Sequence, residues 1–172
     1  MARRVFFSFH FQEDAWRVSQ VRNIGVIRGW EAKPFHDAAS WESVRRAGDR
    51  AIKDWIDRQL DGTSVTVVLV GAQTAQREYV KYEIKESHRR GNGLLGVRIH
   101  KMKNHRRETG KRGHNPFRGI TTIMEETGFL GLWSKKARRR LSDIYPIYDW
   151  VDDNGYENIG LWIAESAAKV GR

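Results

Sequence analysis

The sequence has no cysteine and only three prolines in 172 residues. Without cysteine the protein has no disulfide, no thiolate metal ligand and no thiol nucleophile, and we expect it to work in a reducing cytoplasm. Long apolar runs are also absent. The longest, Val65–Val70, is far shorter than the roughly 20 residues that a membrane-spanning helix needs, so we expect no membrane association.

Sequence motifs that mark several common enzyme classes are missing as well. The chain has no Gly-x-x-x-x-Gly-Lys-Ser/Thr loop, no Gly-x-Gly-x-x-Gly after its first expected strand, no His-Glu-x-x-His and no Gly-x-Ser-x-Gly. These absences argue against ordinary nucleotide hydrolysis, dinucleotide redox chemistry and zinc proteolysis. We predict neither a bound metal nor a resident cofactor.

The chain does contain enough apolar surface for a folded core. Apolar residues make up 40% of it, and it has seven tryptophans and seven phenylalanines, far more ring surface than a disordered chain carries. Chains of this length bury most of the surface that their unfolded forms expose. We expect a single domain over residues 1–172.

The net charge of +10 comes from two segments. Residues 98–118 hold eight lysines or arginines and one acid, residues 135–140 hold five more basic residues, and the remainder is nearly neutral. Clustered cations attract phosphates, so these segments could bind nucleic acid or polyphosphate. The alternative, a solvated loop and a solvated helix face, is the commoner use of such runs.

Hydrophobic spacing predicts alternating strands and helices in the first two thirds of the chain. We expect strands at residues 3–9, 33–36, 63–70 and 94–99, and helices at 11–22, 44–60 and 73–90. The run 63–70 is apolar without alternation, as in a central parallel strand covered on both faces.

The last third has weaker patterns. We expect a loop up to residue 118, a helix over 135–140 within an ambiguous segment 121–141, a fifth strand at 144–148 and a closing amphipathic helix at 159–170. The alternation predicts a three-layer α/β fold with a central parallel five-stranded sheet in the flavodoxin-like order 2-1-3-4-5. Ligands of such sheets bind outside the carboxyl ends of the strands.

Glu83 is the residue that the helical spacing singles out. It shares a partly apolar face with Tyr79, Val80 and Ser87, which the helix should turn toward the sheet. A carboxylate in that position needs a structural partner, a place at the helix margin or a ligand. Glu86 falls on another face and is interpreted as a surface residue.

Three further residues near expected strand ends have both a structural and a functional interpretation. Asp37 could cap a turn or the next helix, or make a polar contact in the strand-end crevice. His10 could be a packed, hydrogen-bonded residue or a catalytic base. Trp41 could belong to the core or stack on a flat heterocycle.

An ordered series of short segments resembles the bacterial TIR-like family, which includes the TIR proteins of Thoeris anti-phage defence. The series runs from Val5-Phe6-Phe7-Ser8-Phe9-His10 through Asp14-Ala15-Trp16-Arg17, Phe35-His36-Asp37-Ala38, Asp49-Arg50-Ala51-Ile52-Lys53, Gly62-Thr63-Ser64-Val65-Thr66 and Tyr79-Val80-Lys81-Tyr82-Glu83-Ile84 to Gly91-Asn92-Gly93-Leu94-Leu95-Gly96. The resemblance covers residues 3–118, whereas residues 119–172 match less distinctly.

The resemblance implies an enzyme that cleaves NAD⁺, as substrate, between nicotinamide and ribose. A cyclic or otherwise modified ADP-ribose would then act as a diffusible signal for a separate effector protein, and the enzyme would need a trigger or self-association for full activity. The family's catalytic glutamate maps onto Glu83. Substrate-binding positions map onto Phe7, Ser8, Phe9, His10, Asp37, Ser40, Trp41 and Tyr79.

Two other functions stay open from the sequence. One is a non-catalytic TIR-like interaction module, in which residues 25–40 form a docking surface and Glu83 is an ordinary helix residue. The other is a nucleic-acid-binding protein that uses residues 101–118 and 138–140.

Overall fold

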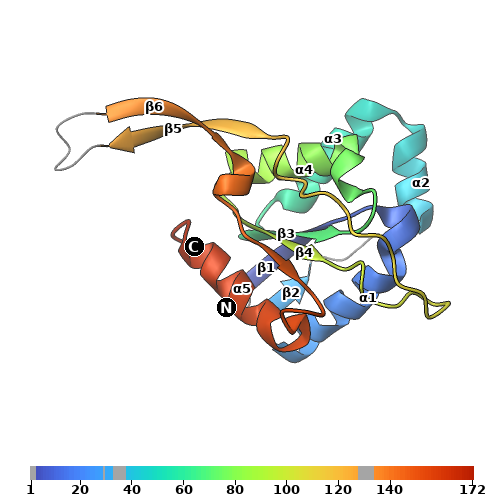
Figure 1. Cartoon of the computed structure of the whole chain (residues 1–172). Coiled ribbons are helices and arrows are strands. Elements are labelled where there is room, and N and C mark those ends of the chain that lie inside the picture. The colour runs from blue at the N-terminus through green and yellow to red at the C-terminus, as the bar shows by residue number, and fades with distance from the viewer. Residues whose placement is uncertain (1–2, 29, 33–37, 128–133) are drawn as a thin grey trace.

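The computed structural model describes residues 3–28, 30–32, 38–127 and 134–172. Its main sheet has five parallel strands in the order β2 (Trp30–Ala32), β1 (Arg3–Ser8), β3 (Val65–Val70), β4 (Gly93–Arg98) and β7 (Ile147–Asp149). Helices lie on both sides of this sheet (Figure 1). The predicted α/β fold with a central parallel sheet is therefore confirmed.

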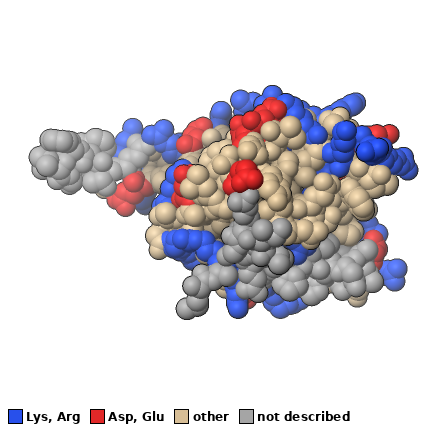
Figure 2. Space-filling view, turned by 90° about the horizontal axis from the view of Figure 1, so that it is seen from below, with Lys and Arg blue, Asp and Glu red and all other residues tan. Residues whose placement is uncertain are grey.

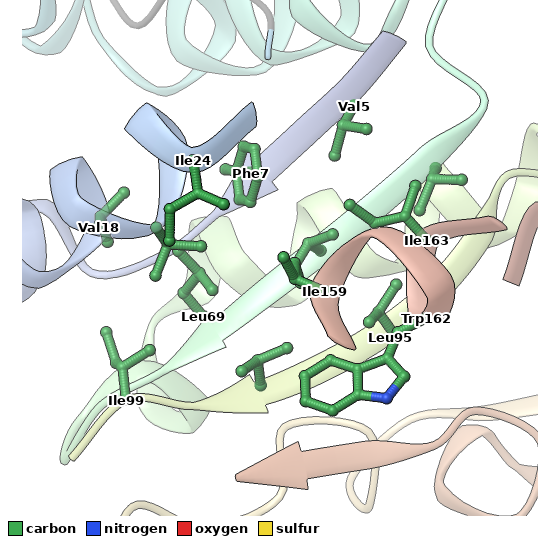
Figure 3. Close-up of a cluster of buried hydrophobic side chains, with 14 of the residues drawn as sticks. Val5, Phe7, Val18, Ile24, Leu69, Leu95, Ile99, Ile159, Trp162 and Ile163 are labelled. Atoms are coloured by element: carbon green, nitrogen blue, oxygen red, sulfur yellow. The ribbon is translucent and has the colours of Figure 1, made fainter. Parts of the chain in front are cut away.

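The core on one face of the sheet is built by α1 (Phe11–Arg28) and α5 (Gly155–Ala168). Their side chains, including Val18, Ile24, Ile159 and Trp162, pack against alternate residues of the central strands (Figure 3). Successive side chains of a strand point to opposite faces, so Leu95 and its neighbours two residues away belong to this side.

The opposite face is covered by α3 (Asp49–Leu60) and α4 (Glu78–Arg89), which follows a short 3-10 turn at Thr74–Gln76. Here α3 packs on Phe6 of β1, and α4 packs on Val68 and Val70 of β3. All six residues of β3 are buried, as the continuous apolar run predicts for a strand covered on both sides.

The first half of the chain departs from the predicted boundaries in two places. Helix α1 continues to Arg28, and the short second strand lies at Trp30–Ala32, whereas the predicted strand at 33–36 falls outside the described residues. The helix predicted at 44–60 is two helices, α2 (Ala38–Arg46) and α3. Gly48, with a φ of 97°, separates them in a conformation that favours glycine.

The helix predicted over residues 135–140 is wrong. Those residues form β6 (Ser134–Arg140), which pairs antiparallel with β5 (Thr121–Thr127) in a hairpin that extends away from the main sheet (Figure 1). Glu125 lies opposite Lys136 and Glu126 opposite Lys135, and cross-strand pairs of opposite charge stabilise a strand that is polar on both faces. Because of this hairpin, the edge strand of the main sheet is the seventh strand of the described residues, and not the fifth as predicted.

The segment between β4 and β5 is a loop, as predicted, and it is fixed to α1. Arg17 is buried, and its guanidinium donates to the carbonyl oxygens of Met102 (2.8 Å) and Glu108 (3.2 Å). In the described part of the chain, no helix is long and apolar enough to cross a membrane.

Candidate active site

The carboxyl end of β1 and the second turn of α4 bring Ser8 and Glu83 together. The buried Ser8 hydroxyl donates a hydrogen bond of 2.5 Å to Oε2 of Glu83. Ser8 faces α4 because it lies two residues after Phe6, which packs on that side of the sheet. The two residues thus connect a strand end to the helix that covers it.

Glu83 points toward the sheet because its neighbours on the helix face do. Val80 and Ile84 are buried in the core beneath α4, and the Ser87 hydroxyl, one turn further on, lies 2.8 Å from the hydroxyl of Thr66 in β3. Residues three and four apart share one face of a helix. The predicted orientation of Glu83 toward the sheet is therefore confirmed.

The carboxyl of Glu83 is desolvated. Burial raises its pKa to about 8, and the hydrogen bond from Ser8 opposes this shift. Among the described residues no lysine or arginine forms an ion pair with it. The residue as a whole stays partly accessible, which a carboxyl that contacts a ligand requires.

Glu86, three residues later on α4, contradicts the prediction that it is a surface residue. It is only 9% exposed and accepts hydrogen bonds from Arg89 (2.5 and 2.8 Å) and Arg90 (2.7 Å). The hydrogen bond from Arg89 is the main reason why its pKa falls to about 2. A structural interpretation explains Glu86 fully.

His10 lies just beyond Ser8 and is buried. Its Nδ1 has no hydrogen-bond partner among the described residues and is 3.8 Å from Oε2 of Glu13. Burial, helped by the positive charge of Arg77, lowers the pKa of His10, so the imidazole is neutral at pH 7. A neutral imidazole has one N–H donor and one acceptor nitrogen, so it can donate a hydrogen bond to a ligand or accept one from it.

The other predicted site residues on these elements lie in different surroundings. Phe7 is in the core on the α1 and α5 side of the sheet (Figure 3). Glu83 contacts Ser8 on the other side, so the prediction that Phe7 borders the substrate does not fit. Phe9 packs partly buried against the same core. Tyr79 packs toward α3 beside Phe6.

Three predicted residues cannot be placed as side chains. Ser40 and Trp41 are in the first turn of α2, but only their backbone is described. Asp37 lies outside the described residues.

Sequence reasoning missed how the end of β3 is packed. Asp14 of α1 is buried, with its Oδ1 3.4 Å from Arg17 Nη1, and a side chain at Gly71 would collide with its carboxyl. Gly113 approaches the Gly71 carbonyl so closely that a Cβ would lie 1.9 Å from the oxygen. Two features of the sequence could have indicated this packing. Asp14 and Arg17 are three residues apart, a spacing that puts both on one face of a helix, and glycines occur at positions 110 and 113.

The two basic segments are distributed over the surface. Lys101 pairs with Asp152 at 2.5 Å, and β6 faces two acids of β5. On the side of the molecule shown in Figure 2, Lys and Arg lie mostly around the margin, and the area between them holds mainly uncharged residues and a few Asp and Glu. Within the described residues, no group of His, Asp or Glu side chains is arranged to hold a metal ion.

The fold and the site together define a flavodoxin-like α/β protein with a desolvated carboxyl, that of Glu83, at the carboxyl edge of a parallel sheet. Residues 6–104 match the family model described as "Thoeris protein ThsB, TIR-like domain". The chain therefore belongs to the Thoeris ThsB family of TIR-like proteins. It is also 35% identical, over 193 aligned positions that cover 95% of this chain and all of the relative, to a protein of Bacillus cereus (strain MSX-D12) named "Putative cyclic ADP-D-ribose synthase ThsB1".

Proposed function

We propose that this protein cleaves the bond between nicotinamide and ribose in NAD⁺, with Glu83 as the catalytic carboxylate. The observation that carries the proposal is the desolvated Glu83 carboxyl beside Ser8, at the strand edge where ligands of parallel sheets bind. The membership in the ThsB family and the name of the B. cereus relative support the same reaction.

A single carboxylate suffices for this reaction. When the bond between the anomeric carbon and the pyridinium nitrogen breaks, its electron pair goes to the nitrogen and nicotinamide leaves as a neutral molecule. The leaving group therefore needs no proton, whereas the sugar oxygen in ordinary glycosidases does. The positive charge left on the ribose is what the enzyme must stabilise, and an anion in a site with little water does so strongly.

The raised pKa of Glu83 couples its charge to the substrate. In the ligand-free protein at pH 7 a carboxyl with a pKa of about 8 is mostly protonated. A bound nicotinamide ring is positively charged, and a nearby positive charge favours the ionised carboxylate. The catalytic anion would therefore form mainly when NAD⁺ occupies the site.

The product depends on which nucleophile reaches the anomeric carbon. Attack by water gives ADP-ribose and attack by a ribose hydroxyl of the same molecule gives a cyclic product, and in both cases the attacking oxygen loses its proton to solvent. Attack by an adenine ring nitrogen of the same molecule also gives a cyclic product, and that nitrogen uses its lone pair and has no proton to lose. We propose the cyclic or otherwise modified product, as the signal that activates a separate effector protein after an infection-dependent trigger.

Mass spectrometry of small molecules from phage-infected cells tests reaction and product together. Cells with the wild-type protein should lose NAD⁺ and accumulate a new ADP-ribose derivative, and cells with Glu83→Gln should not. Glu78→Gln is the matched control, because Glu78 is an exposed acid in the first turn of the same helix. Equal product from the Glu83→Gln cells would contradict the proposal.

A further inference from the structure

Arg98, the last residue of β4, lies on the same face of the sheet as Ser8 and Glu83. Leu94 packs into the core beneath α4, whereas Leu95 and Val97 pack on the opposite side. By alternation Arg98 points to the α4 side. Arg98 pairs in the register with Val70, the last residue of β3. Its side chain therefore leaves the backbone at the carboxyl edge of the sheet.

The polar atoms at this edge lack the partners that burial normally demands. Arg98 Nε is buried without a hydrogen-bond partner in the described chain, and so is Nδ1 of His100, a residue only 9% exposed. Oδ2 of Asp149 lies 3.8 Å from this Nδ1, beyond hydrogen-bond distance. Buried donors are almost always hydrogen-bonded in folded proteins, so these atoms point to a ligand.

The loop that follows β4 adds a second arginine. Gly110 donates its N–H to the carbonyl oxygen of His100, and Gly113 packs directly on Gly71 at the end of β3. Arg112, between these contacts, is exposed. The pKa of Arg98 is lowered by the burial of Arg98 itself and by the positive charge of Arg112. Arg112 therefore lies in a loop that packs on the end of β3, the strand next to the one that carries Arg98.

The acids at this edge do not neutralise the two arginines. Asp149 uses Oδ1 to accept the N–H groups of Val151 and Asp152. Asp152 forms an ion pair with Lys101, and Asp153 accepts the N–H of Asp149. Asp14, buried at the end of β3, lies 3.4 Å from Arg17. These acids are thus engaged by other groups, which leaves an excess of positive charge from Arg98 and Arg112 near the buried imidazole.

We propose that Arg98, Arg112 and His100 bind the diphosphate of the dinucleotide whose ribose lies against Glu83. Ser8 and Gly96 are two strands apart in the register, and Arg98 lies two residues beyond Gly96. Strand spacing and rise then place the Cα atoms of Ser8 and Arg98 about 12 Å apart. A ribose and an extended arginine side chain can span that separation, and a guanidinium is the side chain best suited to a phosphate. This inference rests on the proposed function.

Calorimetric binding of ADP and of adenosine to the full-length protein tests the diphosphate site separately from catalysis. Arg98→Gln and Arg112→Gln should each weaken ADP binding by about 10- to 100-fold and leave the weak binding of adenosine unchanged. Arg98→Lys keeps the charge and should lose less. Arg138→Gln, on the hairpin, is the control and should bind ADP as the wild type does, and circular dichroism should show that each variant is folded.

The outcomes separate this site from the proposed reaction. Glu83→Gln should bind ADP normally while it releases no nicotinamide. If Arg98→Gln and Arg112→Gln fold and bind ADP like the wild type, the diphosphate site is refuted, even when Glu83→Gln abolishes NAD⁺ cleavage. If the arginine variants lose ADP binding but Glu83→Gln still cleaves NAD⁺, the diphosphate site stands and the catalytic assignment fails.

Discussion

The Ser8 hydroxyl and the Glu83 carboxyl are joined by a hydrogen bond of 2.5 Å across 75 residues of sequence. Ser8 is buried at the end of β1, and Glu83 is held over it by the apolar residues on either side of it in α4. A hydroxyl that donates to a carboxylate stabilises its ionised form. Under the proposed function, Ser8 positions the catalytic acid and adjusts its charge.

Ser8→Ala should shift the pH dependence of NAD⁺ cleavage. Without the hydroxyl the pKa of Glu83 rises further, because the hydrogen bond is what lowers it against burial. The rise of kcat/KM with pH should move to higher pH, with a loss of about tenfold or more at pH 7. The control is Ser19→Ala, since Ser19 is exposed on α1; an unshifted profile for Ser8→Ala would contradict the role of this bond.

Glu83 should make the protein less stable as the pH rises. Its pKa is raised from 4.5 to about 8 in the folded state, so its contribution to stability is complete below pH 4.5 and is lost as the pH rises through 8. Glu83→Gln removes this loss and should raise the free energy of unfolding by about 0.5–2 kcal/mol at pH 8.5. Urea unfolding at pH 4.5 and 8.5 measures the difference, which Glu78→Gln should not show.

Glu86 should have the opposite pH dependence. Its pKa is lowered from 4.5 to about 2 by Arg89 and Arg90, so its stabilisation is present above pH 4.5 and is lost as the pH falls toward 2. Glu86→Gln should lower the free energy of unfolding by about 1–3 kcal/mol at pH 7 and by less at pH 3. A larger loss at pH 3 than at pH 7 would show that the ion pairs do not act as the structure indicates.

The contact of Gly113 with Gly71 should be necessary for the loop to sit over the strand ends. A Cβ at residue 113 would lie 1.9 Å from a backbone oxygen, so Gly113→Ala must displace the loop. We expect a stability loss of about 1–3 kcal/mol and weaker ADP binding. Gly119→Ala in the same loop meets no atom within 4 Å and is the matched control. Equal behaviour of the two variants in thermal unfolding would contradict this packing.

The central part of the fold follows from local pattern. The unbroken apolar run of β3 is buried on both faces of the strand, and the apolar residues of α4 lie on the helix face that packs on the sheet. Glu83 shares that face of α4. For that reason the sequence predicts the parallel sheet and the inward direction of this acid. Phe7 shows the limit of a motif match, because alternation along β1 places it on the opposite side of the sheet from Ser8.

Features that depend on contacts between distant segments were not predictable. Residues 135–140 carry no apolar stripe, and their strand conformation depends on pairing with β5, which the hydrophobic pattern does not encode. Glu86 appears solvent-facing on a helical projection, and only the folded chain shows that two arginines and neighbouring side chains cover it. The position of Arg112 near the strand that carries Arg98 likewise depends on the path of a loop.

Release of nicotinamide by the purified protein, with an extract of phage-infected cells supplied as the activator, tests the central claim most directly. The wild type and Glu78→Gln should release nicotinamide from NAD⁺ at similar rates, and Glu83→Gln should be slower by about 100-fold or more. A folded Glu83→Gln variant that releases nicotinamide at the wild-type rate would contradict the assignment of Glu83 as the catalytic carboxylate.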